Sequence, residues 1–149
     1  MNIGILGAGT WGIALARMLC KAGNDVTVWS AIGEEIDSLA STRKHPNLPG
    51  IELPAQLRYT KDISAACAGT DILVFAVPSV YVRSTAEKAA PYIADGQIIV
   101  DVAKGIEEET LMTMTQIIKD EIPQCEPAAL SGPSHAEEVS RGLLTTCVA

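Results

Sequence analysis

Short apolar runs alternate along the chain with segments whose apolar residues recur at helical spacing. The runs are rich in Ile, Val and Leu, which is typical of strands buried on both faces of a parallel sheet. The intervening segments indicate amphipathic helices. We predict strands over residues 2–6, 25–29, 71–77, 97–102 and 128–130. We predict helices over residues 11–22, 34–41 and 62–68, from 78 onward, from 107 towards 120, and over 134–141. The alternation predicts an α/β fold with a doubly wound, mainly parallel sheet and helices on both faces.

Residues 42–58 have no clear period and contain three of the eight prolines, so we predict a long loop there. The last residues, 143–149, have the pattern of a strand that stops without a turn or a polar tail. We therefore expect the native chain to continue beyond residue 149, with residues 1–149 forming one domain.

Glu107, Glu108 and Glu109 are consecutive and allow two interpretations. A cluster of carboxylates is one way to bind a metal ion. Acidic residues in the first turn of a helix also oppose the positive end of the helix dipole, and Pro123 lies just beyond the predicted helix end. We favour the second interpretation and predict no metal site.

Composition limits the classes of partner. The chain has 149 residues and a net charge of −7 without any basic run, which argues against nucleic acid and anionic membrane surfaces as partners. Its four cysteines are widely spaced and form no C-x-x-C pair, which argues against zinc and redox dithiol sites. The N-terminus lacks the basic region and the long apolar segment of a signal peptide or membrane anchor, so we expect a cytoplasmic protein without membrane insertion.

The first predicted strand is followed by a glycine-rich turn, Gly7-Ala8-Gly9-Thr10-Trp11-Gly12, which opens the first predicted helix. In the Rossmann dinucleotide-binding fold, the first glycine permits the tight turn, the second lets the backbone approach the pyrophosphate, and the third allows close packing of helix and strand. The N–H groups at the helix start then face the anion. We predict that this turn holds the pyrophosphate of NAD or NADP.

The residues after the second strand bear on the choice between these nucleotides. An acidic residue that binds the ribose 2'-hydroxyl is expected about 20 residues after the turn. The sequence has Ser30-Ala31-Ile32 instead, and the first carboxylate is that of Glu34. Ser30 can hydrogen-bond either nucleotide, and Arg43 and Lys44 reach a 2'-phosphate only if the long loop folds back. We favour NADP weakly, with NAD also accepted.

Several segments together resemble bacterial NAD(P)-dependent glycerol-3-phosphate dehydrogenases, in order and over the whole chain. The most specific is Ser131-Gly132-Pro133-Ser134-His135-Ala136-Glu137-Glu138-Val139, followed by Arg141-Gly142-Leu143. The other segments are Gly7–Ala16, His45–Pro54, Val77-Pro78-Ser79 and Ala103-Lys104-Gly105-Ile106-Glu107.

The resemblance implies roles for individual residues. It implies that Lys104 contacts both cofactor and substrate, although a surface lysine is usually only solvated. It implies that Gly132 and Ser134 bind substrate, with simple helix N-capping as the alternative for Ser134. We do not expect His135 to act as a base. The complete predicted set is Gly7, Gly9, Thr10, Trp11, Gly12, Lys104 and Ala136 for the cofactor, and Lys104, Gly132 and Ser134 for the substrate; for Trp11 the alternative is a core aromatic.

The chain departs from the family pattern at three places. Ala103 replaces a frequent serine, Asn47 replaces a frequent aromatic residue, and Ser30-Ala31 stands where a basic residue is common. The second and third departures concern the cofactor preference and the adenosine contacts.

The resemblance also implies a reaction for the longer protein. It implies hydride transfer between NAD(P)H and dihydroxyacetone phosphate or glycerol 3-phosphate, for glycerophospholipid precursors, in a protein that forms homodimers. The general base would be a lysine of a helical domain after residue 149. We therefore expect the 149-residue chain to bind cofactor weakly without turnover. Two alternatives stay open here: another dehydrogenase, of the 3-hydroxyacid or 6-phosphogluconate type, and a non-catalytic nucleotide-binding module.

Overall fold

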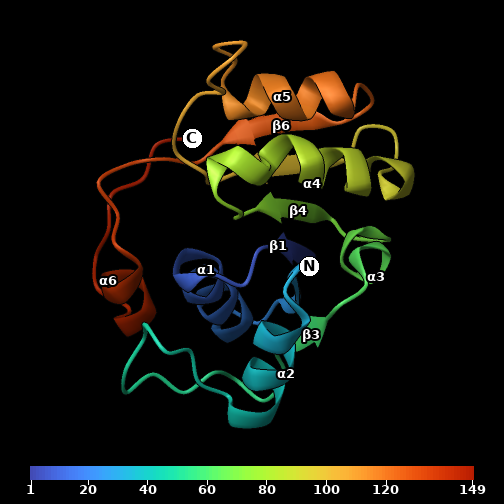
Figure 1. Cartoon of the computed structure of the whole chain (residues 1–149). Helices are drawn as coiled ribbons and strands as arrows, with labels where there is room; N and C mark the ends of the chain where they lie inside the picture. The colour runs from blue at the N-terminus through green and yellow to red at the C-terminus, as the bar shows by residue number, and fades with distance from the viewer.

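The computed structural model describes residues 1–149 and consists of one parallel sheet with helices on both faces (Figure 1). The strands run in the order β3-β2-β1-β4-β5-β6, and every neighbouring pair is parallel. This is the predicted doubly wound α/β architecture. The strands are β1 (Asn2–Leu6), β2 (Asp25–Trp29), β3 (Arg58–Thr60), β4 (Ile72–Phe75), β5 (Ile98–Asp101) and β6 (Glu126–Ala129).

The helices follow the strands in the order that the sequence predicts. They are α1 (Thr10–Lys21), α2 (Gly33–Thr42), α3 (Ile63–Cys67), α4 (Val82–Ala89), α5 (Met114–Glu121) and α6 (Ala136–Arg141). Two 3-10 turns, η1 (Ser79–Tyr81) and η2 (Ala90–Tyr92), flank α4. None of the helices has the length and apolar character needed to cross a membrane.

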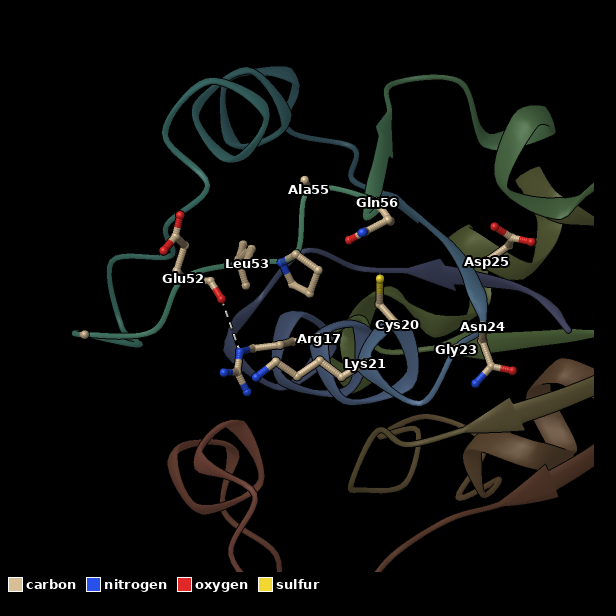
Figure 2. Close-up of a pocket in the computed structure, with 12 residues that line it drawn as sticks. Arg17, Cys20, Lys21, Gly23, Asn24, Asp25, Glu52, Leu53, Ala55 and Gln56 are labelled. Carbon is tan, nitrogen blue, oxygen red and sulfur yellow. Dashed lines mark hydrogen bonds between the residues drawn. The ribbon is translucent and has the colours of Figure 1, made fainter.

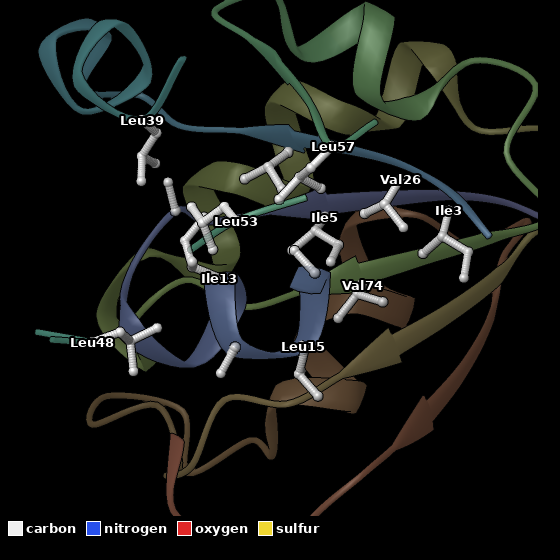
Figure 3. Close-up of a cluster of buried hydrophobic side chains, with 14 of the residues drawn as sticks. Ile3, Ile5, Ile13, Leu15, Val26, Leu39, Leu48, Leu53, Leu57 and Val74 are labelled. Carbon is white, nitrogen blue, oxygen red and sulfur yellow. The ribbon is translucent and has the colours of Figure 1, made fainter. Parts of the chain in front are cut away.

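Two hydrophobic cores lie on opposite faces of the sheet. Side chains alternate between the two faces of a strand, so Ile5 of β1 enters one core and Leu6 enters the other. The first core joins the sheet to α1, α2 and the long loop, and Figure 3 shows Ile5 and Val26 facing Ile13 and Leu57. The second core joins the sheet to α3, α4 and α5.

The last helix, α6, lies beside α1 on the side of the first core (Figure 1). The Arg17 guanidinium of α1 donates to the carbonyl of Ser140, which fastens α6 to the domain. This contact brings the most specific sequence segment back to the glycine turn that begins α1.

The helix predicted from Glu107 starts seven residues later, and the prediction for the three glutamates is wrong. Helix α5 begins at Met114, where Thr113 and Gln116 form a capping box. The carboxylate of Glu107 instead accepts two hydrogen bonds of 2.7 Å from Arg83 of α4. Arg83 also pairs with Asp120 and Glu121 of α5. The ion-pair cluster therefore holds the 106–113 segment, α4 and α5 together, and a helix dipole plays no part.

Two further predictions need correction. Residues 143–149 do not form a strand, because only one antiparallel bridge joins Val148 to Ser131. The predicted loop over residues 42–58 begins one residue later, because Thr42 is the last residue of α2. Residues 43–57 lack helix and strand, and residue 58 begins the short edge strand β3, which the sequence did not predict.

Candidate functional site

A cavity of about 1020 Å³ lies over the carboxyl ends of the strands. The segments that follow β1, β2, β4, β5 and β6 all contribute to its lining. The strand order reverses between β1 and β4, and such a switch point is where open α/β sheets bind their ligands. We call this cavity the switch-point pocket.

The glycine turn forms the floor of this pocket. Gly7 has a φ of +125°, and an added Cβ atom would lie 2.5 Å from the Ala76 carbonyl oxygen. A Cβ atom on Gly12 would lie 2.2 Å from the Gly7 carbonyl oxygen, so the turn closes only with glycine at both positions. Gly9 differs, because its Cβ atom would meet no protein atom within 4 Å. The turn therefore leaves open space at Gly9, on the side of the pocket.

Helix α1 begins directly on this open space. Gly9 is the N-cap residue, and no side chain caps the helix start. The first N–H groups of a helix have no intrahelical acceptor and carry the positive end of the helix dipole. A glycine-lined turn, an uncapped 12-residue helix and open space beside Gly9 together fit a pyrophosphate group.

Thr10 and Trp11 both line the pocket, as the sequence predicted for cofactor contacts. Trp11 is half-buried and also packs against the first core, so its packing in the core and its place in the pocket lining do not exclude each other. The Thr10 hydroxyl accepts a hydrogen bond of 3.0 Å from the Asn47 amide, which brings the long loop to the pocket rim.

The segment after β2 contains a carboxylate that sequence reasoning missed. Glu35, in the first turn of α2, lines the pocket together with Ser30, Ala31 and Ile32. The Ser30 hydroxyl donates to Glu35 Oε2 over 2.7 Å and accepts from the N–H of Ile32 over 3.1 Å. Ser30 is only 7% exposed, so this pair of side chains has a defined position.

Lys104 connects the segment after β5 to the segment after β6. It is exposed and lines the pocket, and its Nζ atom donates to the carbonyl of Gly132 over 3.2 Å. Ser134 and Ala136 line the same pocket. The structure thus brings most of the residues predicted for cofactor and for substrate to one cavity, although they come from opposite ends of the chain. The exceptions are Gly12 and Gly132, which do not line it.

The predicted helix start at Ser134 is shifted in the structure. Helix α6 starts at Ala136 with His135 as its N-cap, and no side chain caps it. N-capping therefore does not account for Ser134, whose backbone N–H instead bonds to the Gly132 carbonyl over 2.9 Å. His135 lines the pocket as well.

One face of α4 lines the pocket and was not predicted from the sequence. Tyr81, Ser84, Thr85 and Lys88 contribute to the lining. Their spacing of three and four residues places them on one side of a helix. That spacing was the available signal, but only a helix from residue 78 onward was predicted, without a role for these four positions; Tyr81 lies at the end of η1 and the other three in α4.

Asp101 is a buried carboxylate at the end of β5, directly before the segment that contains Lys104. It is 3% exposed, and its Oδ1 atom accepts a hydrogen bond of 3.1 Å from the N–H of Ala103. Burial raises the pKa of Asp101 from 3.8 to about 6, against a smaller lowering by the Ala103 N–H. Burial thus disfavours the ionised form of Asp101, and the neutral carboxyl can still accept the hydrogen bond from the Ala103 N–H.

Replacing Asp101 with asparagine is expected to remove a pH dependence of stability. Because the pKa is higher in the folded state, the folded chain binds the proton more tightly, and stability falls as the pH rises from about 4 through about 6. The free energy of unfolding of D101N, relative to wild type, should therefore rise by up to about 3 kcal/mol between pH 4 and pH 8. Urea denaturation of both proteins across this range measures the difference; two parallel pH profiles would contradict the assignment.

A second cavity of about 830 Å³ lies at the opposite end of β2. Figure 2 shows its lining by Arg17, Cys20 and Lys21 of α1 and by the 52–56 segment. Arg17 donates to the Glu52 carbonyl over 3.2 Å across this cavity. Because it lies away from the carboxyl ends of the strands and from the glycine turn, we assign ligand binding to the switch-point pocket.

The comparisons with known proteins identify the family of the chain. The family described as "NAD-dependent glycerol-3-phosphate dehydrogenase N-terminus" matches residues 2–149. The chain belongs to this family. The family match covers the glycine turn, Lys104 and the 131–139 segment, which are the parts of the chain that meet at the switch-point pocket.

Similar glycerol-3-phosphate dehydrogenases, named as NAD(P)+ enzymes, occur in several bacteria. The protein of Lactobacillus delbrueckii subsp. bulgaricus is 56% identical over 99% of this chain and 45% of its own length. The protein of Agathobacter rectalis is 51% identical over 99% of this chain and 44% of its own length. A crystal structure of glycerol-3-phosphate dehydrogenase from Coxiella burnetii superimposes with a TM-score of 0.91 and 30% identity, covering 98% of this chain and 45% of that one. The chain thus spans less than half the length of these relatives.

Proposed function

We propose that this chain is the nucleotide-binding part of an NAD(P)-dependent glycerol-3-phosphate dehydrogenase. The observation that carries the proposal is the convergence of the glycine turn, Lys104 and the 134–136 segment on one pocket. The domain assignment belongs to the proposal: residues 1–149 form the dinucleotide-binding domain, and a helical domain with the general-base lysine follows in the longer protein. The length of the relatives supports this division.

We assign the N–H groups of the glycine turn to the pyrophosphate, with Gly7, Gly9 and Gly12 giving the close approach and Thr10 and Trp11 flanking it. We assign Ala136, at the start of α6, to the cofactor as well. Lys104 contacts cofactor and substrate, and Gly132 and Ser134 bind the substrate's polar groups. The pocket's lining supports these roles for all of these residues except Gly12 and Gly132, for which the support is the motif alone.

The bound nucleotide would give a hydride to C2 of dihydroxyacetone phosphate, or accept one from C2 of glycerol 3-phosphate in the reverse reaction. The Lys104 ammonium places positive charge beside the oxygen on C2 of the substrate. Its hydrogen bond to the Gly132 carbonyl holds the segment after β5 next to the segment after β6. The hydroxyl proton moves to or from the base of the second domain. A role in glycerophospholipid precursor synthesis, a cytoplasmic location and a homodimeric assembly of the longer protein remain predictions.

The weak preference for NADP rested on the absence of a carboxylate beside Ser30. Glu35 reaches Ser30 in the folded chain, which removes that reason. We therefore propose NAD(P) binding as such, without the earlier preference.

Calorimetric titration of the 149-residue chain with NADH and NADPH tests the proposal. We expect saturable binding of at least one nucleotide, at one site per chain. Because the predicted base lies outside these residues, we expect no reduction of dihydroxyacetone phosphate by the chain with bound NADH or NADPH. Failure to bind either nucleotide overturns the proposed function. Measurable reduction of dihydroxyacetone phosphate overturns the proposal that the general base lies in the second domain.

A further inference from the structure

The Ser30–Glu35 pair occupies a specific place in the switch-point pocket. It follows β2, which adjoins β1 in the sheet, and in this fold the end of the second strand faces the ribose of the adenosine half. The usual arrangement has a carboxylate on the strand end itself. Here the strand end supplies a hydroxyl, and the first turn of α2 supplies the carboxylate.

We propose that Glu35 binds the adenosine ribose 2'-hydroxyl and selects NAD(H) over NADP(H). The inference rests on the proposed function, because it requires a dinucleotide in this pocket. The carboxylate accepts the 2'-hydroxyl proton in a charge-assisted hydrogen bond, which is stronger than a neutral one. The 2'-phosphate of NADP(H) has no proton to offer at neutral pH and carries like charge, so the same carboxylate repels it.

The geometry leaves Glu35 able to accept this bond. Glu35 Oε2 receives the Ser30 hydroxyl, and neither an ion pair nor a second hydrogen bond engages Oε1. Glu35 is half-buried, so its charge is less screened than that of a fully exposed carboxylate. The buried Ser30 acts as a positioning residue. Its hydroxyl donates to the Glu35 carboxylate, and the Ile32 N–H holds that hydroxyl in place.

Two of the cations near α2 are engaged elsewhere, and Lys44, which is exposed, does not line the pocket. Arg43 donates to the carbonyls of Pro54 and Leu57, each over 2.9 Å, and lies 5.5 Å from the Tyr59 ring centre. Lys61 pairs with Asp37 over 2.7 Å. Besides Lys104, which is bound to Gly132, the pocket has Lys88 of α4 as its basic side chain. The adenosine end of the pocket therefore presents the Glu35 carboxylate directly beside the end of β2. Lys88 is the cation that could instead bind the 2'-phosphate of NADP(H).

Titration with NADH and NADPH, for wild type and for variants of the chain, tests the inference. We expect wild type to bind NADH at least about tenfold more tightly than NADPH, which is the size of one charge-assisted hydrogen bond. Glu35→Gln keeps the acceptor for Ser30 but removes the charge, and should bring the two dissociation constants within about threefold of each other. Glu34→Gln is the matched control: Glu34 is an exposed acid in the same helical turn that does not line the pocket, so its ratio should stay at the wild-type value.

Ser30 and Lys88 variants separate the remaining explanations. Ser30→Ala should reduce the preference for NADH without abolishing binding, and Ser30→Thr should restore it. A wild-type chain that binds both nucleotides equally, or whose ratio is unchanged by E35Q, overturns the inference and leaves the proposed function standing. If the wild-type chain binds NADPH more tightly than NADH, and Lys88→Gln loses this preference, the inference is also overturned. The 2'-phosphate is then assigned to Lys88. If the wild-type chain binds neither NADH nor NADPH, the proposed function itself is refuted.

Discussion

Gly9→Ala is expected to weaken nucleotide binding strongly while leaving the chain fully folded. Gly9 has a φ of −65°, which alanine adopts without strain, and its new methyl group would meet no protein atom within 4 Å. That methyl group points into the space that we assign to the pyrophosphate, where the backbone must approach the ligand closely. We expect the dissociation constants for NADH and NADPH to rise at least about a hundredfold, since displacement of the phosphates forfeits several charge-assisted hydrogen bonds.

Gly12→Ala is the matched control for this experiment, because it makes the same chemical change three residues away. Its Cβ atom would lie 2.2 Å from the Gly7 carbonyl oxygen, so the turn itself must move. We expect a lower free energy of unfolding, by roughly 1–3 kcal/mol as for other overpacked sites. Thermal denaturation and calorimetry of both variants distinguish the two roles. If G9A binds nucleotide like wild type, the pyrophosphate does not lie over Gly9.

Lys104→Met is expected to lower the activity of the longer protein strongly. The variant keeps the aliphatic stem but loses the ammonium group that donates to Gly132 and faces the pocket. Hydrogen bonds to charged groups contribute roughly 1.5–3 kcal/mol each, so we expect kcat/KM for dihydroxyacetone phosphate to fall about 10- to 100-fold. The melting temperature should stay close to that of wild type, because Lys104 is exposed.

Lys21→Met provides the comparison for Lys104→Met. Lys21 is an exposed lysine of α1 that lines the other cavity (Figure 2). Lys21→Met removes the same charge as Lys104→Met, but Lys21 does not line the switch-point pocket. Its kcat/KM for dihydroxyacetone phosphate should therefore equal that of wild type. Equal losses in the two variants would mean that net charge matters and that Lys104 has no specific role.

The sheet and most helices were predictable because their signals are local. Runs such as Ile72–Phe75 are long and apolar enough to identify a buried strand from the sequence alone. Strand β3 has three residues, Arg58, Tyr59 and Thr60, none of them fully buried, and such an edge strand has no apolar run to detect. The glutamates after Gly105 imitate a helix start, and only Arg83, 24 residues earlier in the chain, explains Glu107.

The candidate site was predictable where a motif is contiguous, and not where two elements combine. The glycine turn and the 131–139 segment could be located from the sequence because their spacing is itself the signal. Glu35 could not, since its position beside Ser30 depends on how α2 leaves β2. The lining of the pocket by α4 likewise depends on the packing of that helix against the sheet.

The position of β1 in the sheet has a consequence for how the chain folds as it is made. Strand β1 precedes both of its partners in the sequence and lies between β2 and β4, and the Asn2 N–H donates to the Asp71 carboxylate, directly before β4, over 2.7 Å. Between the end of β2 at residue 29 and the start of β4 at residue 72, synthesis at about 5–20 residues per second takes about 2–9 s. During that interval one edge of the most buried strand has no partner, so the nascent domain passes through a stage that depends on chaperones or on speed to avoid aggregation.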